Sequence, residues 1–281
     1  MKTRELTARR IDAYVRSLRA EDRAPSTVEK YRRDINAFAG WLAGRLVTKD
    51  LAAQWKNHLL AEGLSPATVN AKLSALNGCF DFLGWQECRI KFLRIQRQLF
   101  REKGRELSRQ EYERLVGTAR DLGRNRLALL METICSTGIR VSELRCITVE
   151  AVRAGQAVIR MKGKIRTILL SRKLCVKLLK YAQKIKAASG EIFLTKSGRS
   201  LSRKQIWQEM KSICARAGVE PSKVFPHNLR HLFAIVFYRI SRDLVKLADT
   251  LGHSSVETTR IYLMSSAAEH AKYLEKLRLV Q

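Results

Sequence analysis

Residues 156–170 read QAVIRMKGKIRTILL, and this stretch decides the fold class. Val158, Arg160 and Lys162 occupy every second position up to Gly163, and the same alternation resumes after it. A period of two that is interrupted by a glycine indicates a β-hairpin. The rest of the chain has the three- and four-residue apolar spacing of helices. The sequence therefore predicts a mainly α protein with one small hairpin, an α+β fold.

The 281 residues are enough for two domains that each bury a core. Helical periodicity, as at Ile35 and Phe38, runs through residues 1–90. Residues 91–105 are rich in basic side chains and lack regular amphipathic spacing, which is typical of a linker. We therefore expect a helical domain at 1–90, a linker at 91–105 and a second domain at 106–281.

Three segments have residues that favour the start of a helix. Ser65 is followed by a proline, so it is expected to be an N-cap with proline in the first helical position. Ser26 and Glu29 have the spacing of a capping box, and so do Ser108 and Glu111. Each of these segments therefore predicts a helix boundary.

The charge of the chain points to a polyanionic partner. There are 54 lysines and arginines against 26 acidic residues, a formal net charge of +28. Such a surplus exceeds what solubility requires. A membrane-surface protein or a basic tail would concentrate these charges, whereas here they are spread among regular apolar positions. Nucleic acid held in a folded groove is the favoured interpretation.

The cysteines and the N-terminal sequence indicate the compartment. No C-x-x-C pair occurs, so neither a zinc site nor a disulfide framework is expected, and the thiols are interpreted as reduced. The sequence MKTRELTARR has no apolar signal region, and no apolar run reaches membrane-spanning length. We expect a cytoplasmic, nucleoid-associated protein. The six cysteines are Cys79, Cys88, Cys135, Cys146, Cys175 and Cys214.

Two basic segments of the second domain carry candidate phosphate ligands. In STGIRVSEL (136–144), Arg140 and Glu143 stand three residues apart, and a solvated surface pair is the ordinary alternative. In PHNLRH (226–231), His227, Arg230 and His231 would share one side of a helix. Arginine suits phosphate because its fork of donors grips two oxygens. An ordinary helix N-terminus is the alternative there, and a metal site lacks nearby acidic or thiol ligands.

A third segment, LGHSSVETTRIYL (251–263), contains His253 and, nine residues later, Tyr262. A single tyrosine among apolar residues is usually part of a core. Its occurrence after the basic hairpin and after the two arginine segments favours a functional role instead.

These segments together resemble the tyrosine recombinase family, which includes Xer-type recombinases and phage integrases. Residues 6–92 look like its helical, SAM-like core-binding domain, and the three segments match its catalytic domain. The resemblance implies a C-shaped clamp on double-stranded DNA with inverted-repeat core sites, and a homo-tetramer formed through the C-terminal tail. It also implies strand exchange without metal, ATP or another cofactor. The matching catalytic residues are Arg140, Lys162, His227, Arg230, His253 and Tyr262.

The hairpin departs from the family pattern. Family hairpins commonly read G-K-G-x-K-x-R, whereas residues 160–166 read RMKGKIR, one residue shorter. Aligning the Lys–Gly step makes Lys162 the match to the catalytic lysine, with Lys164 as the alternative.

Transfer of a phosphodiester between sugar oxygens needs a nucleophile, neutralisation of the charge on the equatorial oxygens and a proton for the leaving group. Tyr262 is the candidate nucleophile, because an aryl oxide also leaves readily when the reaction reverses. Arg140 and Arg230 would hold the nonbridging oxygens, and Lys162 would protonate the leaving 5′ oxygen.

The other candidate residues have supporting roles in this mechanism. His227 and His253 would donate hydrogen bonds to phosphate and handle protons. Glu143 is expected to orient Arg140 or a neighbouring histidine, and His231 to pack inside the domain.

Two alternatives stay open at the level of sequence. A noncatalytic DNA-binding protein would need only the charge and the helices, and a type IB topoisomerase-like enzyme would use the same residues to relax supercoils. The helical N-terminal half and the tail after Tyr262 favour recombination. In the tail, Ser266 and Glu269 have capping-box spacing, and residues 267–281 are amphipathic. Such a helix would dock on its own domain or on a neighbouring protomer.

Overall fold

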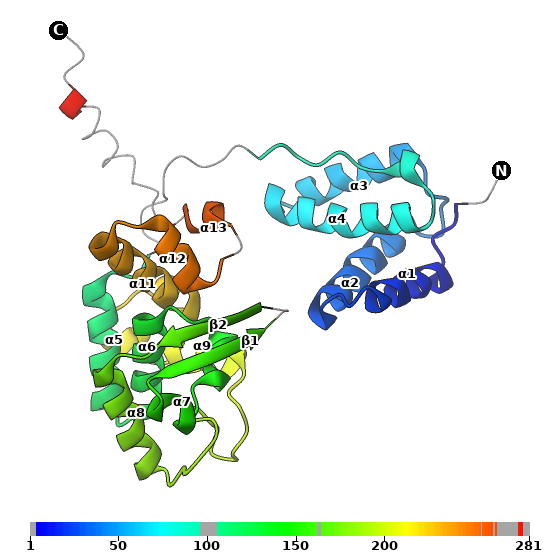
Figure 1. The fold of residues 1–281 in the computed structure, drawn as a ribbon. Helices are drawn as coiled ribbons and strands as arrows, with labels where there is room; N and C mark the ends of the chain where they lie inside the picture. Colours follow the sequence, from blue (N-terminus) through cyan, green and yellow to red (C-terminus); the bar gives the residue numbers. More distant parts are fainter. Residues whose placement is uncertain are drawn as a thin grey trace. The chain divides into compact units, whose positions relative to one another are not determined.

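The computed structural model describes residues 4–95, 106–161, 164–253, 255–260, 262 and 275–277. The chain divides into two compact units, Met1–Arg97 and Gln98–Gln281, each considered by itself (Figure 1). None of the helices described is long and apolar enough to cross a membrane.

The N-terminal unit is a small helical bundle. Its core is built from fully buried apolar side chains such as Ile35, Phe38 and Phe80. Beyond the last helix the chain stays attached to the bundle, because the amide of Asn70 bonds both the N–H and the carbonyl of Leu93. The elements are α1 Ala8–Ala20, α2 Pro25–Leu42, α3 Lys49–Ala61, α4 Pro66–Phe82 and the 3-10 turn η1 Gln86–Cys88.

Two of the predicted helix starts in this unit have different outcomes. Ser65 is the N-cap of α4, and its hydroxyl accepts from the Thr68 N–H, as predicted. The capping box at Ser26 is wrong, because α2 begins one residue earlier, at Pro25. Proline fixes the backbone angle that the first helical residue requires and lacks the N–H that would need a cap. Ser26 therefore lies inside the helix.

The N-terminal unit buries one acidic side chain. The carboxylate of Asp34 on α2 is only 3% exposed and accepts hydrogen bonds from two lysines. Lys30 lies one turn away at 3.0 Å, and Lys72 on α4 lies at 3.4 Å. The ion pair therefore ties α2 to α4, and both lysine side chains stay partly in solvent.

The C-terminal unit is helical around the predicted hairpin, which confirms the mainly α fold class. Helix α6 packs against α5, α8, α9 and α11. The predicted capping box at Ser108 is present, with both reciprocal hydrogen bonds to Glu111. The elements are α5 Arg109–Asp121, α6 Asn125–Thr137, η2 Val141–Cys146, α7 Val149–Arg153, β1 Gln156–Met161, β2 Lys164–Leu169, α8 Arg172–Lys184, α9 Arg203–Lys211, α10 Cys214–Ala217, η3 Pro221–Lys223, α11 Pro226–Ser241, α12 Leu244–Leu251 and α13 Val256–Arg260.

Strands β1 and β2 form the antiparallel hairpin visible in Figure 1. One face, with Ile159 and Ile168, is buried against the unit, and the opposite face, with Val158 and Ile165, is exposed. The turn residues 162–163 lie outside the described residues. The hairpin therefore packs one face on the core of the unit and leaves the other face open.

Candidate active site

A short turn after α6 positions Arg140. Gly138 ends the helix with φ +66°, and a Cβ there would collide with Phe233, so glycine is required. Arg140 then precedes the 3-10 helix η2. Glu143, 2% exposed, accepts from the Arg140 N–H at 2.7 Å and from its Nη1 at 3.1 Å. The Arg140 side chain is 44% exposed, so its guanidinium is held and still accessible.

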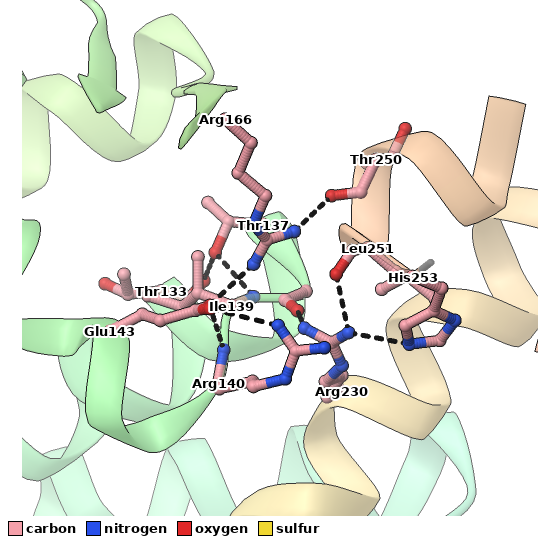
Figure 2. Close-up of polar contacts among 11 residues, drawn as sticks. Thr133, Thr137, Ile139, Arg140, Glu143, Arg166, Arg230, Thr250, Leu251 and His253 are labelled. Atoms are coloured by element: carbon pink, nitrogen blue, oxygen red, sulfur yellow. Dashed lines mark hydrogen bonds and ion pairs between the residues drawn. The ribbon is translucent and has the colours of Figure 1, made fainter. Parts of the chain in front are cut away.

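A second arginine that the sequence interpretation missed completes this arrangement (Figure 2). Arg166 on β2 donates from Nη2 to Glu143 Oε2 at 2.6 Å and from Nη1 to the Thr250 carbonyl at 2.6 Å. Its side chain crosses Gly252, where a Cβ would lie 2.6 Å from Arg166 Cδ. Arg166 therefore connects the hairpin, Glu143 and the end of α12.

Arg230 on α11 is buried, with 2% exposure, and the backbone fixes it. It donates to the Gly138 carbonyl at 2.5 Å and to the Leu251 carbonyl at 2.8 Å. Burial and then the charge of Arg140 lower the pKa of Arg230 to about 10. The guanidinium thus stays charged at neutral pH, and a buried cation beside an accessible one makes a site for an anion.

His253 lies directly beside Arg230. Its Nε2 is 2.9 Å from Arg230 Nη2, and its Nδ1 is 2.8 Å from Thr259 Oγ1. A guanidinium can only donate, so Nε2 accepts and the ring proton is on Nδ1. Burial first, and then the neighbouring cations, lower the pKa of His253 to about 4. The imidazole is therefore neutral near pH 7.

Tyr262 is 3% exposed and packs against the rings of His253 and His231. Its ring stacks on His253 at a centroid distance of 5.9 Å and 15° between planes, and it lies 4.9 Å from the ring of His231. Its hydroxyl interacts with Arg230. The charge of the tyrosine oxygen and a hydrogen bond from the guanidinium raise the pKa of Arg230 and so oppose part of its lowering by burial. The tyrosine oxygen is thus beside a fixed positive charge.

The two remaining histidines lie at the start of α11. His227 is exposed by surface area, but nearby protein removes part of the water around its ring. This desolvation lowers the pKa of His227, and the charges of Arg230, His231 and Arg140 lower it further. His231 is mostly buried and donates from Nε2 to the Glu106 carboxylate at 2.9 Å. Its contacts with Glu106 and with the Tyr262 ring place it inside the unit.

The structure brings together five of the six predicted catalytic residues. The sixth, Lys162, lies outside the described residues, and Lys164 is described only by its backbone, which pairs with Met161. The residues that the sequence interpretation missed are Arg166 and Thr259. Arg166 had a signal, because it is the final arginine of the hairpin pattern, whereas Thr259 had none.

Comparisons with known proteins agree in both units. The sequence model of the phage integrase family matches residues 105–269, and that of the phage integrase N-terminal SAM-like domain matches residues 11–87. The chain belongs to the phage integrase family. This confirms the resemblance to tyrosine recombinases.

Curated and solved members of the family cover most of the chain. Tyrosine recombinase XerA of Pyrococcus furiosus is 27% identical over 100% of this chain and 98% of its own length. Tyrosine recombinase XerD of Brucella suis biovar 1 is 32% identical over 85% of this chain and 86% of its own. Among solved structures, XerH bound to a difH substrate has a TM-score of 0.68 at 20% identity and covers 97% of this chain and 90% of that one. A lambda integrase tetramer on a Holliday junction has a TM-score of 0.72 at 20% identity, over 93% and 78%. These structures share the fold of the phage integrase family member described here.

Proposed function

We propose that this protein is a site-specific DNA recombinase, which cleaves and rejoins duplex DNA through a 3′-phosphotyrosyl intermediate at Tyr262. The observation that carries the proposal is the position of Tyr262, between two histidine rings and beside Arg230. Arg140 supplies a second, accessible guanidinium that Glu143 fixes. Nucleophile and anion ligands thus occur together in a chain of charge +28.

In the proposed reaction the Tyr262 oxygen attacks the phosphorus and loses its proton. The new O–P bond forms as the bond from phosphorus to the 5′ oxygen breaks, and Lys162, or alternatively Lys164, protonates that oxygen. Arg140 and Arg230 neutralise the nonbridging oxygens. The bond energy is kept in the phosphotyrosine, so rejoining needs no ATP, and no metal or other cofactor is required.

The histidines and Glu143 assist this step. His227 and His253 would donate hydrogen bonds to the phosphate, while His231 orients the Tyr262 ring from inside the unit. Glu143 would keep Arg140 in the orientation that the phosphate requires.

The proposed DNA complex uses both units. Residues 1–90 would form the core-binding domain, 91–105 the linker and 106–281 the catalytic domain, closing as a C-shaped clamp around one half of an inverted-repeat site. Four protomers would form the synaptic complex at the nucleoid in the cytoplasm. Support comes from the charge of the chain and from the named lambda integrase tetramer on a Holliday junction.

Tyr262→Phe tests the central claim. The variant should retain DNA binding and form no covalent complex, because one oxygen is lost while the ring packing stays. Wild type and variant are incubated with fragmented genomic DNA, and covalent adducts are captured after denaturation and sequenced. Equal capture by the variant would reject Tyr262 as the nucleophile, and no capture by either protein would favour a noncatalytic DNA-binding protein.

Relaxation of a plasmid that lacks the captured sequence distinguishes the remaining alternative. A topoisomerase-like enzyme would relax it, whereas a site-specific recombinase should leave it supercoiled.

The tail, residues 267–281, is proposed to dock on a neighbouring protomer. Its predicted helix lies outside the described residues, apart from 275–277, which are helical. Deleting residues 267–281 should leave binding to a single captured site within about twofold and abolish two-site complexes, measured by native gel shift. Normal two-site assembly by the truncated protein would indicate docking on its own domain.

A further inference from the structure

Three side chains form a chain of hydrogen bonds beside the proposed nucleophile. Arg230 donates to His253 Nε2, and the Nδ1–H of His253 donates to the hydroxyl of Thr259. Thr259 is fully buried, with 0% exposure. The protein alone thus fixes both the protonation state and the tautomer of His253.

This tautomer is the wrong one for holding phosphate. The nonbridging oxygens of a phosphodiester are acceptors, so a histidine that holds them must present an N–H. His253 instead presents to Arg230 a nitrogen without a proton. When Arg230 turns its Nη2 to a phosphate oxygen, His253 can also donate to that phosphate only if water takes the proton from Nδ1 and water delivers a proton to Nε2. The ring stays neutral, and protons balance.

Adding a second proton to the ring is the alternative route, and its surroundings oppose it. Arg230 on α11, Arg140 before η2, Arg166 on β2 and His227 all interact with His253, and each disfavours a further positive charge. Burial acts in the same direction and lowers the pKa of His253. A neutral exchange of tautomer therefore costs less than protonation.

The neutral exchange needs a partner at Nδ1 that can reverse its role. After the exchange Nδ1 is an acceptor, and a buried acceptor requires a donor. A hydroxyl accepts in the first state and donates in the second, because it carries both a proton and lone pairs. Threonine at position 259 meets this requirement, whereas a carbonyl, a carboxylate or a valine would not.

We propose that Thr259 is a positioning residue whose reversible hydroxyl allows His253 to change tautomer when the phosphate of DNA enters the site. The proposal rests on the proposed function, since it needs a phosphate between the arginines. Thr259 also lies three residues before Tyr262, so the same hydrogen bond ties the segment that carries the nucleophile to His253. Loss of the hydroxyl should impair cleavage without weakening the binding of DNA.

The DNA-free protein provides the first test, which does not depend on the function. The chain has five histidines, so selective ¹⁵N-histidine labelling gives a spectrum that single substitutions can assign. Long-range ¹H–¹⁵N correlation at pH 7 should report the Nδ1–H tautomer for His253. An Nε2–H tautomer or a doubly protonated ring would overturn the proposal.

Cleavage kinetics provide the second test, with Thr259→Val, Thr259→Ser and the neighbouring, exposed Thr258→Val as the matched control. The DNA is a duplex of the sequence that the wild type captures. Thr259→Val should slow covalent complex formation roughly 10- to 100-fold at unchanged affinity, because Nδ1 loses its partner. Thr259→Ser should restore the rate to within about threefold, and Thr258→Val should not change it.

The results separate the two hypotheses. Equal rates for Thr259→Val and wild type, or equal losses for the serine and valine variants, would reject the role of the hydroxyl. Failure of the wild type to capture any DNA would instead reject the proposed function, while the NMR result would still decide the tautomer. Circular dichroism of each variant checks that the fold is intact.

Discussion

Among the described residues, each unit buries one carboxylate that contacts cations, Asp34 with two lysines and with Arg33 at 4.0 Å, and Glu143 with two arginines. Asp34 in the N-terminal unit is 3% exposed and bonds Lys30 and Lys72. Glu143 in the C-terminal unit is 2% exposed and bonds Arg140 and Arg166. The two lysines form hydrogen bonds only to residues of α2 and α4 among those described. Arg140 instead presents its exposed guanidinium at the candidate site, and Arg166 also bonds the Thr250 carbonyl at the end of α12.

The difference follows from the side chains. A lysine ammonium is a compact charge on a flexible stem. Its bond to Asp34 therefore stabilises the contact of two helices but does not orient any further group. A guanidinium is planar with five donors, so Arg166 binds Glu143 and the Thr250 carbonyl at the same time. Buried carboxylates of similar exposure can therefore serve helix packing in one unit and orientation of a site in the other.

The largest expected effect tests this contrast directly. Glu143→Gln should slow covalent capture by roughly 100-fold or more at saturating DNA, because Arg140 loses its fixed orientation at the phosphate. Asp34→Asn should leave the rate within about threefold and lower the free energy of unfolding by about 1 kcal/mol, since its lysines remain solvated. Single-turnover capture and urea denaturation measure the two quantities.

The comparison would break if Asp34→Asn slowed capture as much as Glu143→Gln at saturating DNA. Both variants are isosteric with the wild type, so a difference in packing volume does not enter.

Two glycines give the next test, one from each unit. Gly44 has φ +82°, and no described atom lies within 4 Å of the place that a Cβ would take, whereas Gly252 has φ +63° and the side chain of Arg166 against it. Alanine at either position should cost about 1 kcal/mol of stability for the left-handed backbone. Only Gly252→Ala should also slow capture, by about tenfold, because it displaces Arg166 from Glu143. Equal capture rates for the two variants would show that the Arg166 bridge has no part in catalysis.

The smallest expected effect concerns pH. The pKa of His253 is lowered from 6.5 to about 4, so between these values the unfolded chain binds a proton that the folded unit does not. The stability of the C-terminal unit should therefore be fully present above pH 6.5 and fall towards pH 4, by on the order of 1 kcal/mol. Hydrogen exchange of α12 at pH 7 and pH 5 measures this, with α4 of the N-terminal unit as the reference. His253→Asn should flatten the dependence, and an unchanged slope would assign it to other groups.

Local signals in the sequence were sufficient for much of the fold. The alternation of residues 156–170 predicted the hairpin, and Ser108 and Glu111 predicted a helix start, because both features depend on neighbours within a few positions. The same kind of signal failed at Ser26, where Pro25 defines the first helical residue. Two local rules competed there, and the backbone constraint of proline prevailed over a side-chain cap.

The candidate site was only partly accessible to such reasoning. Arg140 and Glu143 stand three residues apart, so their contact could be predicted from spacing. The partners of Arg166 lie 23 and 84 residues away, at Glu143 and Thr250, and no local pattern encodes these distances. The assignment of the catalytic roles stays a prediction until the variants are measured.

The burial of Tyr262 has a consequence for the genome that the protein meets. Tyr262, the proposed nucleophile, is only 3% exposed, so little of its surface is open to a phosphodiester that slides past it. A protein with this charge binds DNA nonspecifically and meets far more nontarget DNA than target DNA. A fully exposed nucleophile would therefore cause strand breaks outside the target site. Under the proposed function, the ring contacts of Tyr262 with His231 and His253 would keep its oxygen from foreign DNA, and cleavage would require a rearrangement in the correct complex.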